Sequence, residues 1–157
     1  MWKLILNKKY NPLFESDARY FIITGGRGSG KSFAATVFLT LLTMTKGIRI
    51  LFTRFTMTSA HLSIIPEFLE KIGLLGFEDV FSINKAEVLN RSNQSDILFR
   101  GIRTSAGNQT ASLKSLQGIS TWVLDEAEEL VDENIFDTID LSIREKKVQN
   151  RIILVLN

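Results

Sequence analysis

The chain alternates between short, almost wholly apolar runs and longer segments whose apolar residues recur at helical spacing. Short apolar runs bounded by polar residues or glycine are typical of strands that are buried on both faces of a parallel sheet. We expect four such strands, at residues 19–24 (RYFIIT), 48–53 (IRILFT), 120–126 (STWVLDE) and 151–157 (RIILVLN).

The segments between these runs predict helices. Residues 31–47 are apolar on nearly every side, as in a helix packed deep against a sheet, and Gly47 can cap its end. A second helix, which Pro66 can kink, is predicted by an apolar stripe of Leu62, Ile65, Leu69 and Ile72, with Glu67, Glu70 and Lys71 opposite. A third helix is capped by Asp132 and has isoleucines at four-residue spacing, namely Ile135, Ile139 and Ile143.

Residues 79–104 break into shorter strand-like pieces (DVFSI, AEVLNR and SDILFRGI) between turns rich in Asn, Ser and Gln. This pattern predicts a small β-hairpin insertion. Because the other strands alternate with helices, we expect a three-layer α/β fold with a mainly parallel central sheet covered on both faces.

Composition restricts the class of protein. With 157 residues, 45% of them hydrophobic, the chain can bury one core. No apolar run reaches the about 18 residues of a membrane span, and the N-terminal segment, residues 1–14, lacks the cleavage site of a signal peptide. The absence of cysteine excludes disulfides and thiolate metal sites, and the one histidine leaves little for zinc.

The charge is distributed unevenly along the chain, although the net charge is only +2. Residues 1–54 hold nine Lys or Arg against two acidic residues, whereas residues 125–157 hold four against nine. A basic N-terminal third favours polyanions such as a nucleotide or DNA, and an ordinary mixed surface is the alternative.

The last apolar run, residues 151–157, stops at Asn157 without a following turn or helix. A run this apolar belongs in the middle of a sheet. We therefore expect residues 1–157 to form a single domain that is truncated at its C-terminal end.

Residues 25–32 (GGRGSGKS) match the phosphate-binding pattern G-x-x-x-x-G-K-[ST], known as Walker A, between an expected strand and an expected helix. Glycines allow backbone N–H groups to point at phosphate oxygens, and the N-terminus of the helix adds partial positive charge. The expected nucleotide-binding residues are Gly25, Gly26, Arg27, Gly28, Ser29, Gly30, Lys31 and Ser32. Lys31 would reach the β- and γ-phosphates and Ser32 would bind Mg²⁺, whereas a plain glycine turn would not need this Lys-Ser pair.

The second half of the expected site follows the apolar run at residues 122–124. Asp125 would lie at the carboxyl end of that strand, beside the glycine loop, where it can hold Mg²⁺. Glu126, which turns the other way, suits a general base that activates water. The alternative is the acidic start of a surface helix, which does explain Glu128 and Glu129.

The long separation between Lys31 and Asp125 contains further strand-like segments. This suits the P-loop ATPases of the ASCE or RecA-like kind, in which an extra strand lies between the two motif-bearing strands and a glutamate activates water. A GTPase is disfavoured, because no D-x-x-G motif is present.

An arginine that neutralises γ-phosphate charge accelerates hydrolysis in P-loop enzymes. Arg27, inside the loop, is the main candidate, acting in its own site or in that of a neighbouring subunit, so the expected catalytic residues are Glu126, Arg27 and Lys31. Arg54 and Arg144 are weaker candidates and fit surface or ion-pair arginines better.

Two further segments have open roles. Tyr20 and residues 11–14 can line an adenine pocket or serve the core. Residues 112–120, with Lys114, can contact DNA or a neighbouring subunit, or can be a plain connection.

Taken together, these motifs resemble the ATPase domain of large terminase subunits, the DNA-packaging motors of tailed double-stranded-DNA phages, and most closely those of PBSX-like prophages. The resemblance covers nearly the whole chain from residue 10. It rests on RYFIITGGRGSGKS, ILFTRFTMTSAHLSIIPEFLEKIG, the stretch ILFRGI…SLKSLQGISTWVLDEAEEL, and RIILVLN.

The resemblance implies an enzyme that hydrolyses ATP with Mg²⁺ to drive double-stranded DNA into a procapsid. It also implies partners: the portal protein, a small terminase subunit and neighbouring large subunits in a ring on the portal. The expected location is the host cytoplasm and, transiently, the procapsid portal, with no membrane. Leu156 and Asn157 fall where the family begins its coupling motif, and nothing corresponds to the family's nuclease domain, so nuclease activity is not expected from this chain.

Two other classes remain open. A helicase-like or recombinase-like DNA motor would share both motifs. A nucleotide-dependent assembly module would bind ATP without turnover.

Overall fold

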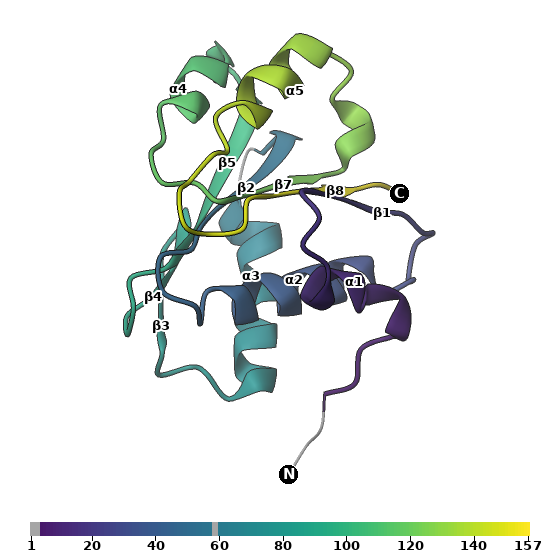
Figure 1. Cartoon of the computed structure of the whole chain (residues 1–157), viewed down its shortest axis with the longest axis vertical. Helices are drawn as coiled ribbons and strands as arrows, with labels where there is room; N and C mark the ends of the chain where they lie inside the picture. The colour runs from purple at the N-terminus through teal and green to yellow at the C-terminus, as the bar shows by residue number, and fades with distance from the viewer. Residues whose placement is uncertain (1–3, 58–59) are drawn as a thin grey trace.

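The computed structural model describes residues 4–57 and 60–157, without the side chains of Ala60 and His61. The first three residues of the segment considered as a signal peptide lie outside the described part of the chain. Eight strands form one sheet in the order β1-β8-β7-β2-β5-β4-β3, and β6 pairs with β5 (Figure 1). The parallel strands are β1 (Tyr20–Ile23), β8 (Arg151–Val155), β7 (Thr121–Asp125), β2 (Arg49–Thr56) and β5 (Asp96–Thr104).

The four predicted apolar strands are all present, as β1, β2, β7 and β8. Burial on both faces explains their unbroken apolar runs: Trp122 and Val123 of β7 point to opposite faces of the sheet and are both fully buried. On its side of the sheet, the indole Nε1 of Trp122 donates a hydrogen bond to Thr53 Oγ1 at 2.8 Å.

The predicted hairpin is continuous with the central sheet. Strands β3 (Phe81–Ile83) and β4 (Glu87–Asn90) pair antiparallel, and β4 pairs antiparallel with β5. Because β5 also pairs in parallel with β2, from Arg49 opposite Asp96 to Thr56 opposite Arg103, the hairpin extends the edge of the main sheet. The short β6 (Gly107–Asn108) folds back on the far end of β5.

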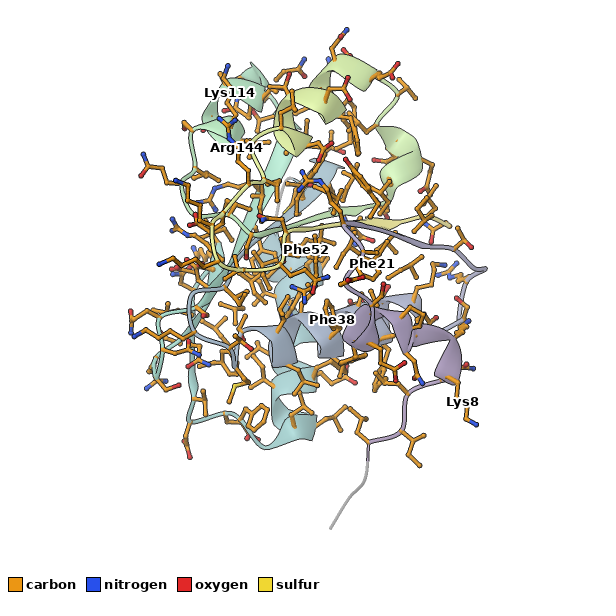
Figure 2. The ribbon with its side chains drawn as sticks, viewed as in Figure 1. Lys8, Phe21, Phe38, Phe52, Lys114 and Arg144 are labelled. Carbon is orange, nitrogen blue, oxygen red and sulfur yellow. The ribbon has the colours of Figure 1, made fainter. Side chains whose placement is uncertain are left out.

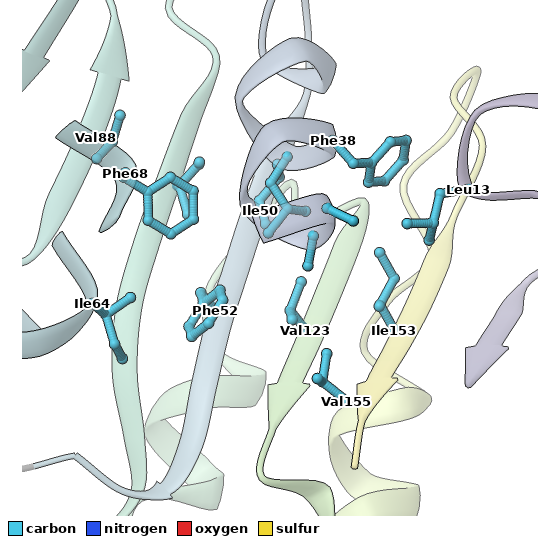
Figure 3. Close-up of a cluster of buried hydrophobic side chains, with 14 of the residues drawn as sticks. Leu13, Phe38, Ile50, Phe52, Ile64, Phe68, Val88, Val123, Ile153 and Val155 are labelled. Carbon is cyan, nitrogen blue, oxygen red and sulfur yellow. The ribbon is translucent and has the colours of Figure 1, made fainter. Parts of the chain in front are cut away.

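Helices cover both faces of this sheet, which confirms the predicted three-layer α/β architecture (Figure 1). One face carries α1 (Pro12–Glu15), α2 (Lys31–Leu42) and α3 (Ala60–Leu75), and the other carries α4 (Thr110–Lys114) and α5 (Glu133–Asp140). Each face has its own apolar core. Figure 3 shows the core under α2 and α3, where Phe52 of β2 and Phe68 of α3 lie close together, with ring centroids 5.9 Å apart.

Helix α3 is rotated relative to the sequence prediction. Leu62 and Leu69, predicted to face the core, are 75% and 49% exposed. The buried residues of the helix are Ile64, Ile65, Phe68, Lys71 and Ile72. The rotation follows from Phe68, whose ring packs on those of Phe52 and Phe99 and directs this side of the helix inward. Lys71, predicted on the polar side, is buried with its ammonium 4.9 Å from the centre of the Phe33 ring.

The other helices match their predictions except at their ends. Helix α5 begins at Glu133 because Asp132 Oδ1 accepts hydrogen bonds from the backbone N–H groups of Asn134 and Ile135. It ends at Asp140, so Ile143 is buried from the connection that follows. Helix α2 ends at Leu42 rather than extending to Gly47. No helix in the described residues is long and apolar enough to cross a membrane.

A buried acidic residue at the start of β5 makes the stability of this fold depend on pH. Burial raises the pKa of Asp96 to about 6, and the nearby Glu87 adds to this rise. The Arg49 guanidinium, whose Nε lies 3.2 Å from the Asp96 carboxylate, lowers the pKa and so opposes the rise. The folded chain therefore binds this proton more tightly than the unfolded chain does. The contribution of this proton to the free energy of unfolding is complete below the pKa that Asp96 has in the unfolded chain, and it is lost as the pH rises through about 6.

We predict that Asp96→Asn flattens the pH dependence of stability. Between pH 4 and pH 7 the free energy of unfolding of the wild type, relative to the variant, should fall by about 1–3 kcal/mol. Urea unfolding of both proteins at several pH values measures this difference, with the exposed Asp79→Asn as the control that keeps the wild-type profile. Parallel profiles for Asp96→Asn and the wild type would contradict the prediction.

Candidate active site

The glycine loop and the acidic pair are brought together by β8, which lies between β1 and β7. Val155 of β8 is level with Ile23, at the end of β1, on one side and with Asp125, at the end of β7, on the other. Because these strands are parallel, their carboxyl ends meet at one edge of the sheet. Residues 25–32, which follow β1, and Glu126, which follows β7, therefore leave the sheet at the same edge.

The loop between β1 and α2 has a positive φ, which favours glycine, at three positions: Gly25, Gly28 and Gly30. Gly25 has φ +150°, and a Cβ there would lie 2.8 Å from Ser29 Oγ. Gly30 has φ +84° and directly precedes the first residue of α2. Residues 26–28 are exposed, so the loop presents its backbone and the Arg27 side chain to solvent.

Lys31 and Tyr10 hold this loop through hydrogen bonds to its backbone carbonyls. Lys31 is only 6% exposed, and its ammonium donates hydrogen bonds to the carbonyl oxygens of Gly25 and, at 3.2 Å, Gly26. The Tyr10 hydroxyl, at the end of the short 3-10 helix η1 (Lys8–Tyr10), donates to the Ser29 carbonyl at 3.0 Å. Sequence reasoning missed Tyr10, because no local pattern marks a contact between residues 19 positions apart.

A cavity of about 470 Å³ lies beside the loop, between the N-terminal segment and β1. Of the residues considered for an adenine pocket, it is lined by Tyr20, Pro12 and Leu13. Asn11 and Phe14 do not line it, and the Phe14 ring packs edge-on against Phe38 of α2, with centroids 5.1 Å apart.

The acidic pair is held by Arg54 at the end of β2. The Arg54 guanidinium contacts Asp125 Oδ2 through Nε at 2.8 Å and through a terminal nitrogen at 2.7 Å. The same Nε lies 3.9 Å from Glu126 Oε2. The sequence left Arg54 either as a catalytic arginine or as a surface or ion-pair arginine. The structure shows an ion pair, and its acidic partner is Asp125, the expected metal ligand.

Glu126 has a left-handed backbone, with φ +54°, and precedes the 3-10 helix η2 (Ala127–Glu129). This conformation is uncommon for a residue with a side chain and turns the chain sharply away from the direction of β7. A non-glycine residue held in such a conformation costs about 1–3 kcal/mol and is found preferentially at functional sites.

Ser32, Arg54, Glu67 and Asp125 line one small pocket, about 10 Å³ in volume, which is large enough for roughly one water-sized group. Ser32 comes from the first turn of α2, and Glu67 from the middle of α3. Partial burial raises the pKa of Glu67; Lys71 and Arg54 oppose this rise, and Asp125 adds to it. Hydroxyl and carboxylate oxygens are the ligands that Mg²⁺ prefers, so this donor set fits the ion.

The remaining sequence candidates lie elsewhere. Arg144 is exposed in the connection that leads to the amino end of β8, and Lys114 is exposed at the end of α4 (Figure 2). Gln117 and Gly118, which follow α4, line a groove with Arg49 at the amino end of β2. The loop at residues 112–120 thus reaches the edge of the sheet opposite the glycine loop.

Structures with a similar fold come from large terminases and from a DNA packaging ATPase of phages. The Thermus phage P74-26 large terminase ATPase domain has a TM-score of 0.70 at 15% identity, with 97% of this chain and 64% of that one covered. The large terminase of a thermophilic bacteriophage, solved in complex with ADP, has a TM-score of 0.69 at 10% identity, with 96% and 38% covered. The N-terminal domain of the DNA packaging ATPase from bacteriophage phi29 has a TM-score of 0.65 at 17% identity, with 96% and 78% covered.

The chain spans between about a third and two thirds of the first two of these structures. No curated protein sequence matches it. A family model described as "Phage terminase large subunit" matches residues 17–157, nearly the whole chain. The chain therefore belongs to the phage terminase large subunit family, and it has the P-loop α/β fold of the ATPase domains of these proteins.

Proposed function

We propose that residues 1–157 are an ATPase domain that hydrolyses Mg-ATP and so powers the movement of double-stranded viral DNA into a procapsid. The observation that carries this proposal is the register of β8, which brings the glycine loop and the Asp125–Glu126 pair to one edge of the sheet. A phosphate-binding loop and a water-activating carboxylate have to meet in this way for hydrolysis.

The loop binds the phosphates in this proposal. Backbone N–H groups of residues 25–32 and the start of α2 attract the anion, and Lys31 leaves the carbonyls of Gly25 and Gly26 to reach the β- and γ-phosphates. The cavity beside β1 receives the nucleobase, with Tyr20 and Leu13 in its wall. Tyr10 fixes the loop backbone in position through the Ser29 carbonyl.

Ser32 and Asp125 would hold Mg²⁺, whose charge offsets that of the phosphate oxygens. Glu126 orients water and accepts its proton. Arg54 keeps the Asp125 carboxylate in place, and the exposed Arg27 supplies positive charge to the γ-phosphate, in its own site or in a neighbour's.

The partners follow from family membership and from what related structures are called. One relative is described as a DNA packaging motor and another as a viral genome packaging motor assembly. We propose the same setting here: a ring of large subunits on the portal protein, working with a small terminase subunit on double-stranded DNA in the host cytoplasm. A nucleotide-binding assembly module, without turnover in isolation, is the second candidate, because the exposed Arg27 can act on a neighbouring subunit.

Turnover and binding should separate in two variants. Glu126→Gln should lower phosphate release from Mg-ATP by about 100-fold or more while nucleotide affinity stays within a few fold, because a general base acts on the chemical step. Lys31→Ala should lower nucleotide affinity itself. Phosphate release and equilibrium binding measured side by side test both, with the exposed Glu129→Gln as the control. Full turnover in Glu126→Gln would refute the assignment, and wild-type binding without turnover, even with DNA and portal present, would favour the assembly module.

Removal of the Arg54 guanidinium should reduce both stability and activity. Arg54→Gln leaves the partly buried Asp125 without its ion pair, which should cost about 1–3 kcal/mol in the free energy of unfolding. Phosphate release should fall as well, because Asp125 loses its fixed position. The matched control is Arg103→Gln, an exposed arginine of β5 for which the described residues show no ion pair. If denaturant unfolding showed that Arg54→Gln is as stable as the wild type and as Arg103→Gln, Arg54 would not have the role described.

A further inference from the structure

Glu67 faces the same small pocket as Ser32 and Asp125, although it comes from α3, outside both sequence motifs. Its position results from the rotation of α3, because burial of Ile64 and Phe68 directs this part of the helix toward α2 and β2. Glu67 interacts electrostatically with both Asp125 and Arg54. Together with Asp125 and Glu126, it is one of three carboxylates near the Arg54 guanidinium.

Helix α3 is fastened to α2 next to this pocket. Lys71, one turn after Glu67, is buried, and its ammonium lies 4.9 Å from the ring centre of Phe33, the residue after Ser32. The same ammonium lies 3.0 Å from Oε1 of Glu70, which does not line the pocket. The distance between Glu67 and the start of α2 is therefore fixed by packing.

Glu67 determines the net charge of the side chains that line the pocket. Asp125 carries one negative charge, and Arg54, at 2.7 Å, carries one positive charge that offsets it. Ser32 is neutral. Without Glu67 the side chains lining the pocket would have no net charge, and with Glu67 ionised the net charge is negative.

We infer that Glu67 is a further positioning residue of the proposed nucleotide site. Its carboxylate holds the waters bound to Mg²⁺ rather than the ion itself. Mg²⁺ in nucleotide sites keeps several of its waters, and carboxylates outside the first ligand shell orient such ligands and strengthen metal binding. This inference rests on the proposed function, since it requires a Mg-nucleotide bound between the glycine loop and Asp125.

The test is the gain in affinity for a fluorescent ADP analogue, mant-ADP, when Mg²⁺ replaces EDTA. In Glu67→Gln this gain should shrink about tenfold relative to the wild type, whereas affinity in EDTA should be unchanged or higher. Glu67→Asp keeps the charge with a shorter reach and should fall between them. Glu70→Gln is the matched control, three residues along the same helix, and should keep the full gain.

A full Mg²⁺ gain in Glu67→Gln overturns the inference, and so does an equal loss in Glu70→Gln, which would indicate only the general charge of the surface. The proposed function fails separately if mant-ADP binds the wild type and Lys31→Ala equally well. A third result would refute this inference alone and leave the proposed function standing. In that case mant-ADP binding would depend on Lys31, but the gain in affinity with Mg²⁺ would be the same with and without Glu67.

Discussion

The parallel pairing of β8 with β1 on one side and β7 on the other is the interaction on which the rest of the structure depends. Without β8, the glycine loop and the acidic pair would have no common edge. The strand also joins the two cores, because Ile152 packs with the cluster under α5 and Ile153 with the cluster under α2. Its apolar sequence thus serves stability and site geometry together.

Two polar arrangements turn this shared edge into a defined site. On the loop side, Tyr10 and Lys31 hydrogen-bond to backbone carbonyls, so the glycines that allow the turn are not left to move freely. On the acidic side, Arg54 holds Asp125, and Glu126 follows in a left-handed conformation. These contacts join an N-terminal helix, the loop and two strands. Changes far from the loop in sequence can therefore alter the site.

Local patterns predicted the features that local physics determines. Continuous apolar runs marked β1, β2, β7 and β8, the Asp132 side chain marked the start of α5, and the order of strands and helices indicated the three layers. In the sheet one strand, β8, lies between the two motif-bearing strands, although it follows both of them in the sequence. The roles assigned to the glycine loop, Asp125 and Glu126 remain predictions, although the structure brings these residues to one edge.

The features that sequence patterns missed depend on contacts between distant residues. Leu62 and Leu69 match a helical period but face solvent, because the orientation of α3 is decided by Phe68 packing on Phe52 and Phe99. The hairpin joins the main sheet through the pairing of β5 with β2, which spans about 50 residues of chain. The bond from Tyr10 to Ser29 and the ion pair of Arg54 with Asp125 likewise exist only after the chain has folded.

The most direct test of the proposal that one nucleotide site is built at this shared edge is hydrogen–deuterium exchange of the wild-type chain with and without Mg-ADP. Exchange of backbone amides should slow in residues 25–32 and around Asp125 and Glu126, while residues 117–120, at the opposite edge of the sheet, should exchange at unchanged rates. If Mg-ADP slowed exchange at the opposite edge, or slowed it in the loop without affecting the end of β7, the claim that one site is built from both strands would be contradicted.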